Sequence, residues 1–370
     1  MTTTLTLPDF SQAAPSAWQP GVDDTVKCVG IRQETHDVKT FVFRSIEPRR
    51  FAYHPGQFLT LELNINGETV NRCYTLSSTP TRPDTVSITV KRVPGGVVSN
   101  WLHDNLKVGD DVSVLGPSGE FSSFSLAPNA PKYLYLSAGS GVTPLMSMSR
   151  AHVDMSSNRD IVFLHSARSP SDVIFARELQ AMSRHQPGFR HAVICERPGV
   201  DEDYAGYLGY LSAPMLELIA PDYKEREVFC CGPAPYMTAV KNVLQSLGFD
   251  MTHYHEESFS FETLNAASEE TADVPAGDAD SSSDGFKLSF TKSDLVVSCQ
   301  PPKTLLAAAK EAGMRFPSSC SQGLCGTCKT KLVSGEVDMK HGGGIRQREI
   351  DQGWILPCCS IPKTDVVLDR

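Results

Sequence analysis

Four cysteines near the end of the chain have the spacing of a metal site. Cys320, Cys325 and Cys328 are separated by four and then two residues, and Cys358 follows well downstream. Four thiolates with this spacing can surround a [2Fe–2S] cluster. Gly323, inside the loop, can adopt the positive φ that turns backbone N–H groups toward the sulfurs. We therefore predict that these four cysteines hold an iron–sulfur cluster.

Zinc is the main competitor for these thiolates. Structural zinc sites are usually built from paired Cys-x-x-Cys units, and only Cys325 and Cys328 form such a pair here. Cys358 and Cys359 are adjacent, which is poor geometry for one tetrahedral metal. The iron–sulfur interpretation is preferred. A zinc-stabilised interaction protein without redox activity is the alternative from a different functional class.

The segment around the cysteines resembles the plant-type ferredoxin family. Pro317-Ser318-Ser319 precedes the cysteine loop, and Leu356-Pro357 precedes Cys358. The resemblance implies a β-grasp ferredoxin domain over residues 286–370, in which Cys359 is a bystander. That domain begins with the pattern of a hairpin followed by a helix.

Length and composition limit the remaining possibilities. A chain of 370 residues is long enough for two or three domains, because single cores stop growing near about 250–300 residues. It has no apolar run long enough to span a membrane as a helix and no basic residue before Lys27 to begin a secretory signal. Eleven cysteines, four in cluster spacing, are typical of a reducing compartment. The net charge of −9 argues against nucleic acid as a partner. We expect a monomeric cytoplasmic protein without a membrane segment.

Pattern and charge divide the chain into successive parts. Residues 1–22 contain three prolines and no periodicity, which predicts a flexible tail. Residues 23–125 contain short β-type runs broken by Pro and Gly, which predicts a small antiparallel barrel. Residues 126–261 alternate strands and helices, which predicts a parallel, doubly wound α/β sheet with its ligand at the carboxyl ends of the strands. Residues 262–285 hold seven acidic residues and no basic one, which predicts an extended acidic linker. The expected fold class is therefore a multidomain α/β and β protein.

The ferredoxin-like part of the chain has 12 basic and eight acidic residues. Its net positive charge suits docking to acidic redox partners.

Two stretches of the barrel segment could hold a flavin nucleotide. Arg72 and Tyr74 share one face of a predicted strand, and the hydroxyl of Thr75 follows. Gly95-Gly96 then opens a predicted helix whose free N–H groups could bind a pyrophosphate. Each motif alone is equally compatible with a plain strand and a plain helix start.

Together, and in this order, these stretches resemble the flavin-binding domain of the ferredoxin–NADP⁺ reductase superfamily. The resemblance implies that Tyr74 packs on the isoalloxazine, that Thr75 hydrogen-bonds near the flavin N5 and that Arg72 neutralises phosphate. It also implies flavin contacts from Val90 and Lys91 on the ribityl side and from Gly96, Val97 and Ser99 at the pyrophosphate. FAD is the flavin we expect, with FMN as the alternative, because related phthalate-type reductases use FMN.

Two glycine-containing turns could hold a nicotinamide nucleotide. Gly139-Ser140-Gly141 follows a predicted strand but lacks the third glycine of the dinucleotide fingerprint. Cys231-Gly232-Pro233 follows a later strand, and the two turns together resemble the nicotinamide side of the same superfamily. The resemblance implies that Thr143 and the glycine turn contact ribose and phosphates and that Cys231 faces the site of hydride transfer.

Two further residues complete the predicted sites. Arg168 ends the second strand, where the adenosine ribose is read, and we expect NADH rather than NADPH there. The stretch Glu257-Ser258-Phe259 resembles the Glu-x-Phe that ends this domain in the superfamily, and Phe259 is expected near the flavin edge. The predicted catalytic residues are Tyr74, Thr75 and Cys231.

These cofactors together indicate an electron path. NADH gives up two electrons as a hydride, a cluster accepts one electron at a time, and a flavin can stand between them. The order of the domains resembles reductase components of Rieske-type oxygenases. The run 71–84 is most similar to reductases that serve glycine betaine or carnitine monooxygenases. We therefore expect a path from NADH to FAD, to [2Fe–2S] and to a partner oxygenase. Reductases of hybrid-cluster proteins and of other hydroxylases share the architecture and are the alternatives.

Overall fold

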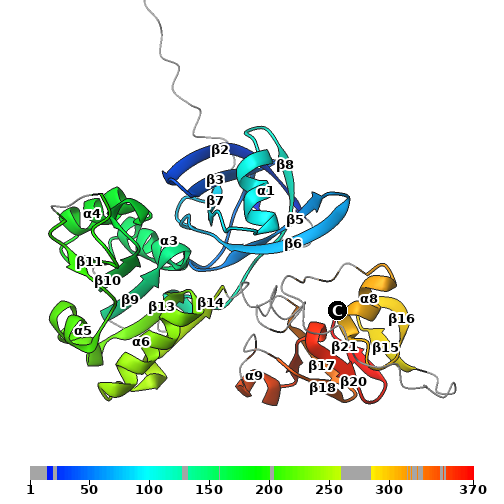
Figure 1. Cartoon of the computed structure of the whole chain (residues 1–370). Helices are drawn as coiled ribbons and strands as arrows, with labels where there is room; N and C mark the ends of the chain where they lie inside the picture. The colour runs from blue at the N-terminus through cyan, green and yellow to red at the C-terminus, as the bar shows by residue number, and fades with distance from the viewer. Residues whose placement is uncertain are drawn as a thin grey trace, which may run out of the picture.

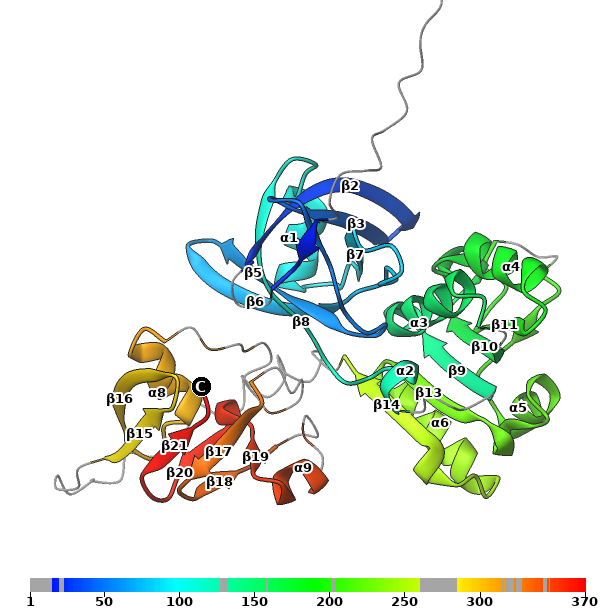
Figure 2. The same ribbon diagram turned by 180° about the vertical axis from the view of Figure 1, so that it is seen from behind.

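The computed structural model of the chain contains three groups of elements, each with its own hydrophobic core, and Figures 1 and 2 both show the last group as a separate body. No helix in the described part of the chain is long and apolar enough to cross a membrane. The structure describes residues 15–19, 23–126, 132–157, 159–200, 204–259, 285–314, 316, 318, 323, 328–341, 345 and 347–370.

The first group is an antiparallel barrel, as predicted. Its strands hydrogen-bond in the order β6-β5-β8-β2-β3-β7, and an antiparallel bridge between Leu76 and Ile88 joins the two outer strands. Helix α1 (Val97–Asn105) buries Val98 and Leu102 in the barrel core. The strands are β2 (Thr25–Thr35), β3 (Val38–Ser45), β5 (Phe58–Ile65), β6 (Glu68–Thr75), β7 (Val86–Lys91) and β8 (Asp111–Ser118).

Part of the segment that we expected to be a flexible tail is packed on the barrel. Strand β1 (Ser16–Ala17) pairs in parallel with β4 (Arg49–Arg50). Trp18 is 4% exposed, stacks on Phe51 with ring centroids 4.9 Å apart and donates its indole N–H to the carbonyl of Gly116 at 3.0 Å. The prediction was wrong for residues 15–19, because one indole buries a large apolar area and finds an acceptor for its N–H. The rest of the predicted tail lies outside the described residues.

The second group is a six-stranded parallel sheet with helices on both faces. Its strand order is β12-β11-β10-β9-β13-β14, so the order reverses between β9 and β13, where doubly wound sheets bind ligands. Helices α3 (Val142–Asp154) and α4 (Ala176–His185) pack on one face, and α5 (Ala213–Ile219) and α6 (Ala234–Ser246) pack on the other. The strands are β9 (Lys132–Ala138), β10 (Asp160–Ala167), β11 (Phe189–Cys195), β12 (Tyr207–Leu208), β13 (Glu227–Gly232) and β14 (Tyr254–Ser258).

Helix α3 joins this sheet to the barrel. The buried guanidinium of Arg150 forms two hydrogen bonds with Glu178, at 2.7 and 2.6 Å, and also donates to the carbonyl of Ser77 on the barrel. At the end of α3, Asp154 accepts hydrogen bonds from Arg82 at 3.0 and 2.8 Å. A buried, hydrogen-bonded arginine fixes the approach of two surfaces more strongly than an exposed pair does. The barrel and the sheet are therefore held together along the second half of α3.

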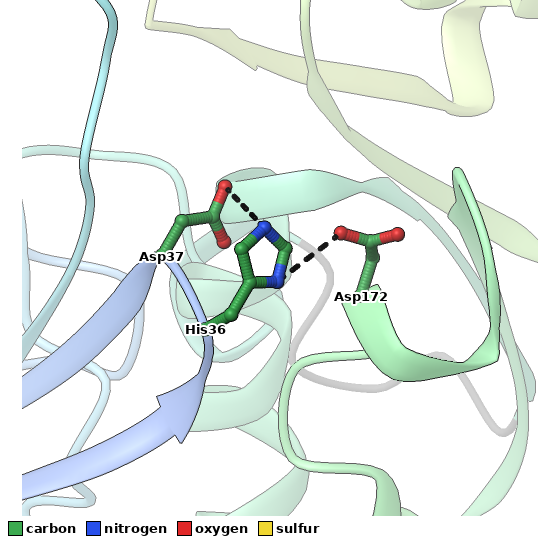
Figure 3. A group of neighbouring side chains, drawn as sticks. All are labelled: His36, Asp37 and Asp172. Carbon is green, nitrogen blue, oxygen red and sulfur yellow. Dashed lines mark ion pairs between the residues drawn. The ribbon is translucent and has the colours of Figure 1, made fainter. Parts of the chain in front are cut away.

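A second contact joins them at the turn between β2 and β3. His36 lies between Asp37 of the barrel and Asp172 of the sheet domain, with each ring nitrogen 3.8 Å from a carboxylate oxygen (Figure 3). These three groups could in principle hold a cation. Lys91 already places its ammonium group 3.1 Å from Asp37, which opposes a second positive charge there. We interpret the cluster as a bridge between the two domains.

The third group is a mixed sheet with a helix packed on it, as expected for a β-grasp domain. Its strand order is β16-β15-β21-β17-β19, with β15 and β21 parallel. Helix α8 (Leu305–Glu311) is capped by the hydroxyl of Thr304 and buries Leu305 and Leu306 in the core. The other elements are β15 (Phe286–Phe290), β16 (Ser293–Cys299), β17 (Thr330–Ser334), β18 (Val337–Met339), α9 (Gln347–Asp351), β19 (Trp354–Ile355), β20 (Ser360–Pro362) and β21 (Val366–Leu368). The predicted acidic linker falls almost entirely outside the described residues.

A buried arginine fixes the end of the parallel sheet opposite to the switch point. The guanidinium of Arg226 donates to Asp222 at 2.8 Å, to Asp160 at 3.0 and 3.1 Å and to the carbonyl of Tyr133 at 3.1 Å. The hydrogen bonds from Arg226 lower the pKa of Asp222 to about 2. One side chain thus ties β9, β10 and the turn before β13 together.

We predict that Arg226→Met destabilises the sheet domain by about 3 kcal/mol, the lower end of the range for breaking a buried pair, because both carboxylates still reach water. Chemical denaturation at neutral pH measures this loss. Because the folded-state pKa of Asp222 is depressed, the stabilisation is present above its ordinary value of 3.8 and is lost as the pH falls toward 2. The difference between the variant and the wild type should therefore shrink in acid.

Arg190→Met is the matched control. Its side chain is 52% exposed and lies 3.6 Å from the same Asp160, so its loss should change stability by less than about 0.5 kcal/mol. Equal losses in both variants would contradict the role given to the buried guanidinium.

Candidate cofactor sites

Strand β6 carries the residues predicted to meet the flavin ring. Arg72 and Tyr74 are half-buried and share one face of the strand, and Thr75 is buried at its end. Tyr74 packs against the barrel core, and burial raises the pKa of its hydroxyl. Tyr74 therefore stays an uncharged phenol. Such a ring can pack on a flat aromatic ligand without carrying a charge to it.

The start of α1 has the geometry of an anion site. No described side chain caps the helix, whose N-cap is Gly96, and Val97 at its first position is 59% exposed. The hydroxyl of Ser99 accepts a hydrogen bond from the backbone N–H of Val93 at 3.2 Å. A Cβ at Gly96 would lie 2.7 Å from that hydroxyl oxygen, so a larger residue there would have to displace the Ser99 side chain. An uncapped helix start with free N–H groups suits a phosphate.

Two other predicted flavin residues lie on β7. Val90 is buried in the barrel core. The ammonium group of Lys91 pairs with Asp37 at 3.1 Å and lies close enough to His165 on β10 to help burial lower the pKa of that imidazole. Lys91 therefore lies near the sheet domain as well as on the barrel.

The two glycine turns predicted for the nicotinamide nucleotide meet at the switch point of the sheet. A Cβ at Gly141 would lie 2.2 Å from the carbonyl oxygen of Cys231 and 2.6 Å from the backbone nitrogen of Gly232. A Cβ at Gly232 would lie 2.8 Å from the ring of Tyr236. Only glycine allows this approach of two strand ends. Thr143 braces the first turn, because its hydroxyl donates to the carbonyl of Ser140 at 3.0 Å.

Buried polar atoms near this edge of the sheet fit a polar ligand. The Nε2 atom of His165 is buried and has no hydrogen-bond partner among the described residues, and the buried hydroxyls of Tyr236 and Ser166 lie beside each other. A buried polar group without a partner costs about 1–3 kcal/mol, so a bound nucleotide with ribose and amide groups would relieve that cost. Pro233 and Arg168 are exposed near the same edge.

The sequence analysis included one carboxyl group, at the junction of barrel and sheet, in the Glu-x-Phe resemblance but gave it no role. Glu257 lies opposite Cys231 in the β13–β14 register, and its Oε2 atom is buried with no partner among the described residues. Burial, with a smaller contribution from Cys73, raises the pKa of Glu257 to about 8, and nearby Thr75 partly offsets this rise. Thr75 of the barrel and Cys231 of the sheet are thus brought to one protonated carboxyl group. The residue stands in the stretch 254–259, but only the register of the sheet shows where it points.

Cys231 itself is a buried thiol. Burial raises its pKa well above the ordinary value, and the negative charge of Glu257, when ionised, raises it further. The group is therefore no nucleophile, since the thiolate is the reactive form. Phe259, two residues after Glu257, packs on the core beneath α3 and α4.

Two of the four predicted cluster ligands lie among the described residues. Cys328 and Cys358 are buried, and the backbone N–H of Gly323 donates to the sulfur of Cys358 at 3.2 Å. N–H bonds of this kind are what thiolate ligands of a cluster accept. Cys320 and Cys325 lie outside the described residues.

The sulfur of Cys359 lies close to Leu356 and Gly323. It donates a weak hydrogen bond to the carbonyl of Leu356 at 3.5 Å. The φ of Gly323 is +71°, and a Cβ there would lie 2.6 Å from the sulfur of Cys359. Gly323 thus lies between the two sulfurs, with its N–H donating to Cys358 and its Cα next to Cys359. The donor set fits an iron–sulfur cluster.

Comparison with known families agrees with this geometry. The chain matches an oxidoreductase FAD-binding domain over residues 26–123, an oxidoreductase NAD-binding domain over residues 135–242 and a 2Fe-2S iron-sulfur cluster binding domain over residues 290–363. These matches confirm the predicted FAD, NAD and [2Fe–2S] domains and favour iron–sulfur over zinc.

Relatives cover nearly the whole chain. It is 49% identical to the glycine betaine monooxygenase reductase subunit of Pseudomonas aeruginosa, over 93% of this chain and 94% of that protein. It is 48% identical to the corresponding subunit of Chromohalobacter salexigens, over 97% and 98%. Phthalate dioxygenase reductase has the same fold, with a TM-score of 0.57 at 24% identity over 94% of this chain and 97% of that chain. The chain belongs to the family of monooxygenase reductase subunits that join an FAD-binding barrel, an NAD-binding sheet and a [2Fe–2S] domain.

Proposed function

We propose that this chain is the NADH-dependent reductase of a Rieske-type monooxygenase that demethylates glycine betaine or a related quaternary amine. The observation that carries the proposal is the junction at which Thr75 of the barrel and Cys231 of the sheet meet the buried carboxyl group of Glu257. The choice of oxygenase and substrate rests on the relatives named above.

When bound, FAD supplies the means to take a hydride from NADH and to pass single electrons to the [2Fe–2S] cluster. The residues of this chain position these groups and keep water away. Tyr74 offers an uncharged ring and the start of α1 offers backbone N–H groups. Glu257 holds a proton near neutral pH.

The glycine turn and the hydroxyls of Ser166 and Tyr236 are proposed to bind the nicotinamide nucleotide. Arg168 is exposed at the end of β10, where it would read the adenosine ribose. Cys320, Cys325, Cys328 and Cys358 are proposed to bind the cluster. We propose further that the protein is a cytoplasmic monomer, in keeping with the nine free cysteines that the structure describes.

The acceptor is identified by reconstitution. The purified chain, NADH and candidate oxygenases are combined, and product formation from glycine betaine and other quaternary amines is measured. Turnover with a Rieske-type oxygenase supports the proposal. Failure with every such oxygenase, together with fast transfer to a hybrid-cluster protein, would reject it.

We predict that Cys358→Ser abolishes electron transfer to the oxygenase while the NADH-dependent reduction of ferricyanide through the flavin continues. The cluster needs all four thiolates, whereas the flavin site lies on the other two domains. The matched control is Cys359→Ser, which changes the adjacent cysteine and should keep both activities. Loss of ferricyanide reduction in Cys358→Ser, with the flavin still bound, would contradict the claim that the flavin is reduced without the cluster domain.

We predict that flavin reduction by NADH slows as the pH rises through about 8, the pKa of Glu257. The ionised carboxylate would oppose the negative charge that the flavin takes up with the hydride. Glu257→Gln should remove this inflection in stopped-flow measurements. Glu256→Gln is the control, because Glu256 already pairs with Lys241 at 2.6 Å, and it should keep the wild-type profile.

Thermal denaturation gives an independent readout for Glu257. Because the folded-state pKa lies above the ordinary value of 4.5, the folded protein keeps a proton that the unfolded chain releases, and stability falls as the pH rises between these values. Glu257→Gln should therefore gain stability relative to the wild type between about pH 5 and pH 8. A constant difference across this range would show that the carboxyl group titrates normally.

A further inference from the structure

Lys329 connects the cysteine domain to the barrel domain. Its ammonium nitrogen lies 2.6 Å from Glu349 of its own domain and 3.0 Å from Glu120, which follows β8 of the barrel. The two carboxylates differ in exposure, because the side chain of Glu349 is 12% exposed and that of Glu120 is 54% exposed. Glu349 therefore holds the lysine in place, and Glu120 is the partner that water can replace.

Both ends of the Glu120–Lys329 contact are attached to candidate cofactor sites. Lys329 directly follows the proposed cluster ligand Cys328. On the barrel side, the carbonyl of Gly119, next to Glu120, accepts a hydrogen bond from the side chain of Gln57 at 3.0 Å. The residue after Gln57, Phe58, pairs with Thr75 in the β5–β6 register. The Glu120–Lys329 ion pair thus connects the residue after Cys328 to the region of β5 and β6, the strands next to the candidate flavin site.

The strength of this contact suits reversible docking. An ion pair with one exposed partner is worth only about 0.2–1 kcal/mol, and salt screens it over about 10 Å at 0.1 M ionic strength. A contact of that size biases the position of a domain without locking it. The acidic segment 262–285 that joins the two domains carries no basic residue, so it offers no cation that would compete for Glu120.

We propose that the Glu120–Lys329 pair is the electrostatic contact that docks the cluster domain on the flavin domain for internal electron transfer and releases it for the outside acceptor. The inference rests on the proposed function and adds the residues that direct docking. In each docked period one electron leaves the reduced flavin and enters the oxidised cluster, so one NADH supplies two such transfers. Lys329 acts as a positioning residue in this step, with Glu349 as its fixed support and Glu120 as its exchangeable partner.

The test compares Glu120→Gln with the wild-type holoenzyme. In stopped-flow mixing with NADH, bleaching of the flavin and the later reduction of the cluster are followed separately in a series of salt concentrations. Flavin bleaching should be unchanged in Glu120→Gln. Transfer from flavin to cluster should be about two- to fivefold slower at low salt and should lose most of the salt dependence that the wild type shows.

Three variants make the result specific. Glu47→Gln removes another exposed barrel glutamate and should behave as the wild type. Lys329→Gln should be slow, and Glu120→Gln with Lys329→Gln should be no slower, because the two groups act through one contact. Because Glu120 lies outside the cluster domain, Glu120→Gln keeps the proposal testable if Lys329→Gln fails to fold.

Small-angle X-ray scattering gives a readout that does not depend on the cofactors. At low salt the radius of gyration of Glu120→Gln should exceed that of the wild type and of Glu47→Gln, and high salt should remove the difference. Identical transfer rates, salt dependence and radii in Glu120→Gln and the wild type would overturn the proposal. If NADH bleaches no flavin even in the wild type, the proposed function itself fails.

Discussion

The structure depends on the approach of two strand ends at the switch point of the parallel sheet. Gly141 and Gly232 let the ends of β9 and β13 come so close that a Cβ at Gly141 would lie 2.2 Å from the carbonyl oxygen of Cys231. The neighbouring strand β14 then sets Glu257 opposite Cys231. Helix α3 begins directly after the turn that contains Gly141, and its Arg150 is hydrogen-bonded to the barrel. The close packing of the two strand ends therefore also fixes the position of the FAD-binding domain relative to the NAD-binding domain. A protonated carboxyl group at the junction follows from the burial that this packing imposes.

Local patterns in the sequence predicted the three folds and named most of the residues of the candidate site, whose roles stay predictions. Three patterns are local in the sequence: the cysteine spacing, the alternation of strands and helices, and the two glycine turns. Each can be recognised, and its structure predicted, without coordinates. The Glu-x-Phe resemblance includes Glu257 but gives it no role, because only the register with β13 shows that Glu257 lies opposite Cys231 while Glu256 is exposed. For Trp18 the error came from composition. The composition of residues 1–22 predicted a flexible tail, but the buried side chain of Trp18 anchors part of this segment on the barrel.

Charge is used differently in the interior and at the domain boundary. Arg226 and Arg150 are buried and make several hydrogen bonds each, which holds the sheet together and binds it to the barrel. Lys329 makes one contact with a largely exposed carboxylate of another domain. The first arrangement gives a rigid pair of domains, and the second permits the cluster domain to dock and leave. A reductase that must serve an internal donor and an external acceptor in turn needs both.

The central claim is that this chain divides the two electrons of NADH into single electrons that leave through an iron–sulfur cluster. Analysis of iron, acid-labile sulfide and flavin in protein expressed anaerobically with iron supplied tests it most directly. The account predicts about two irons, about two sulfides and one flavin per chain, with a visible spectrum that NADH bleaches. Protein that contains zinc or no metal, and no acid-labile sulfide, would contradict it.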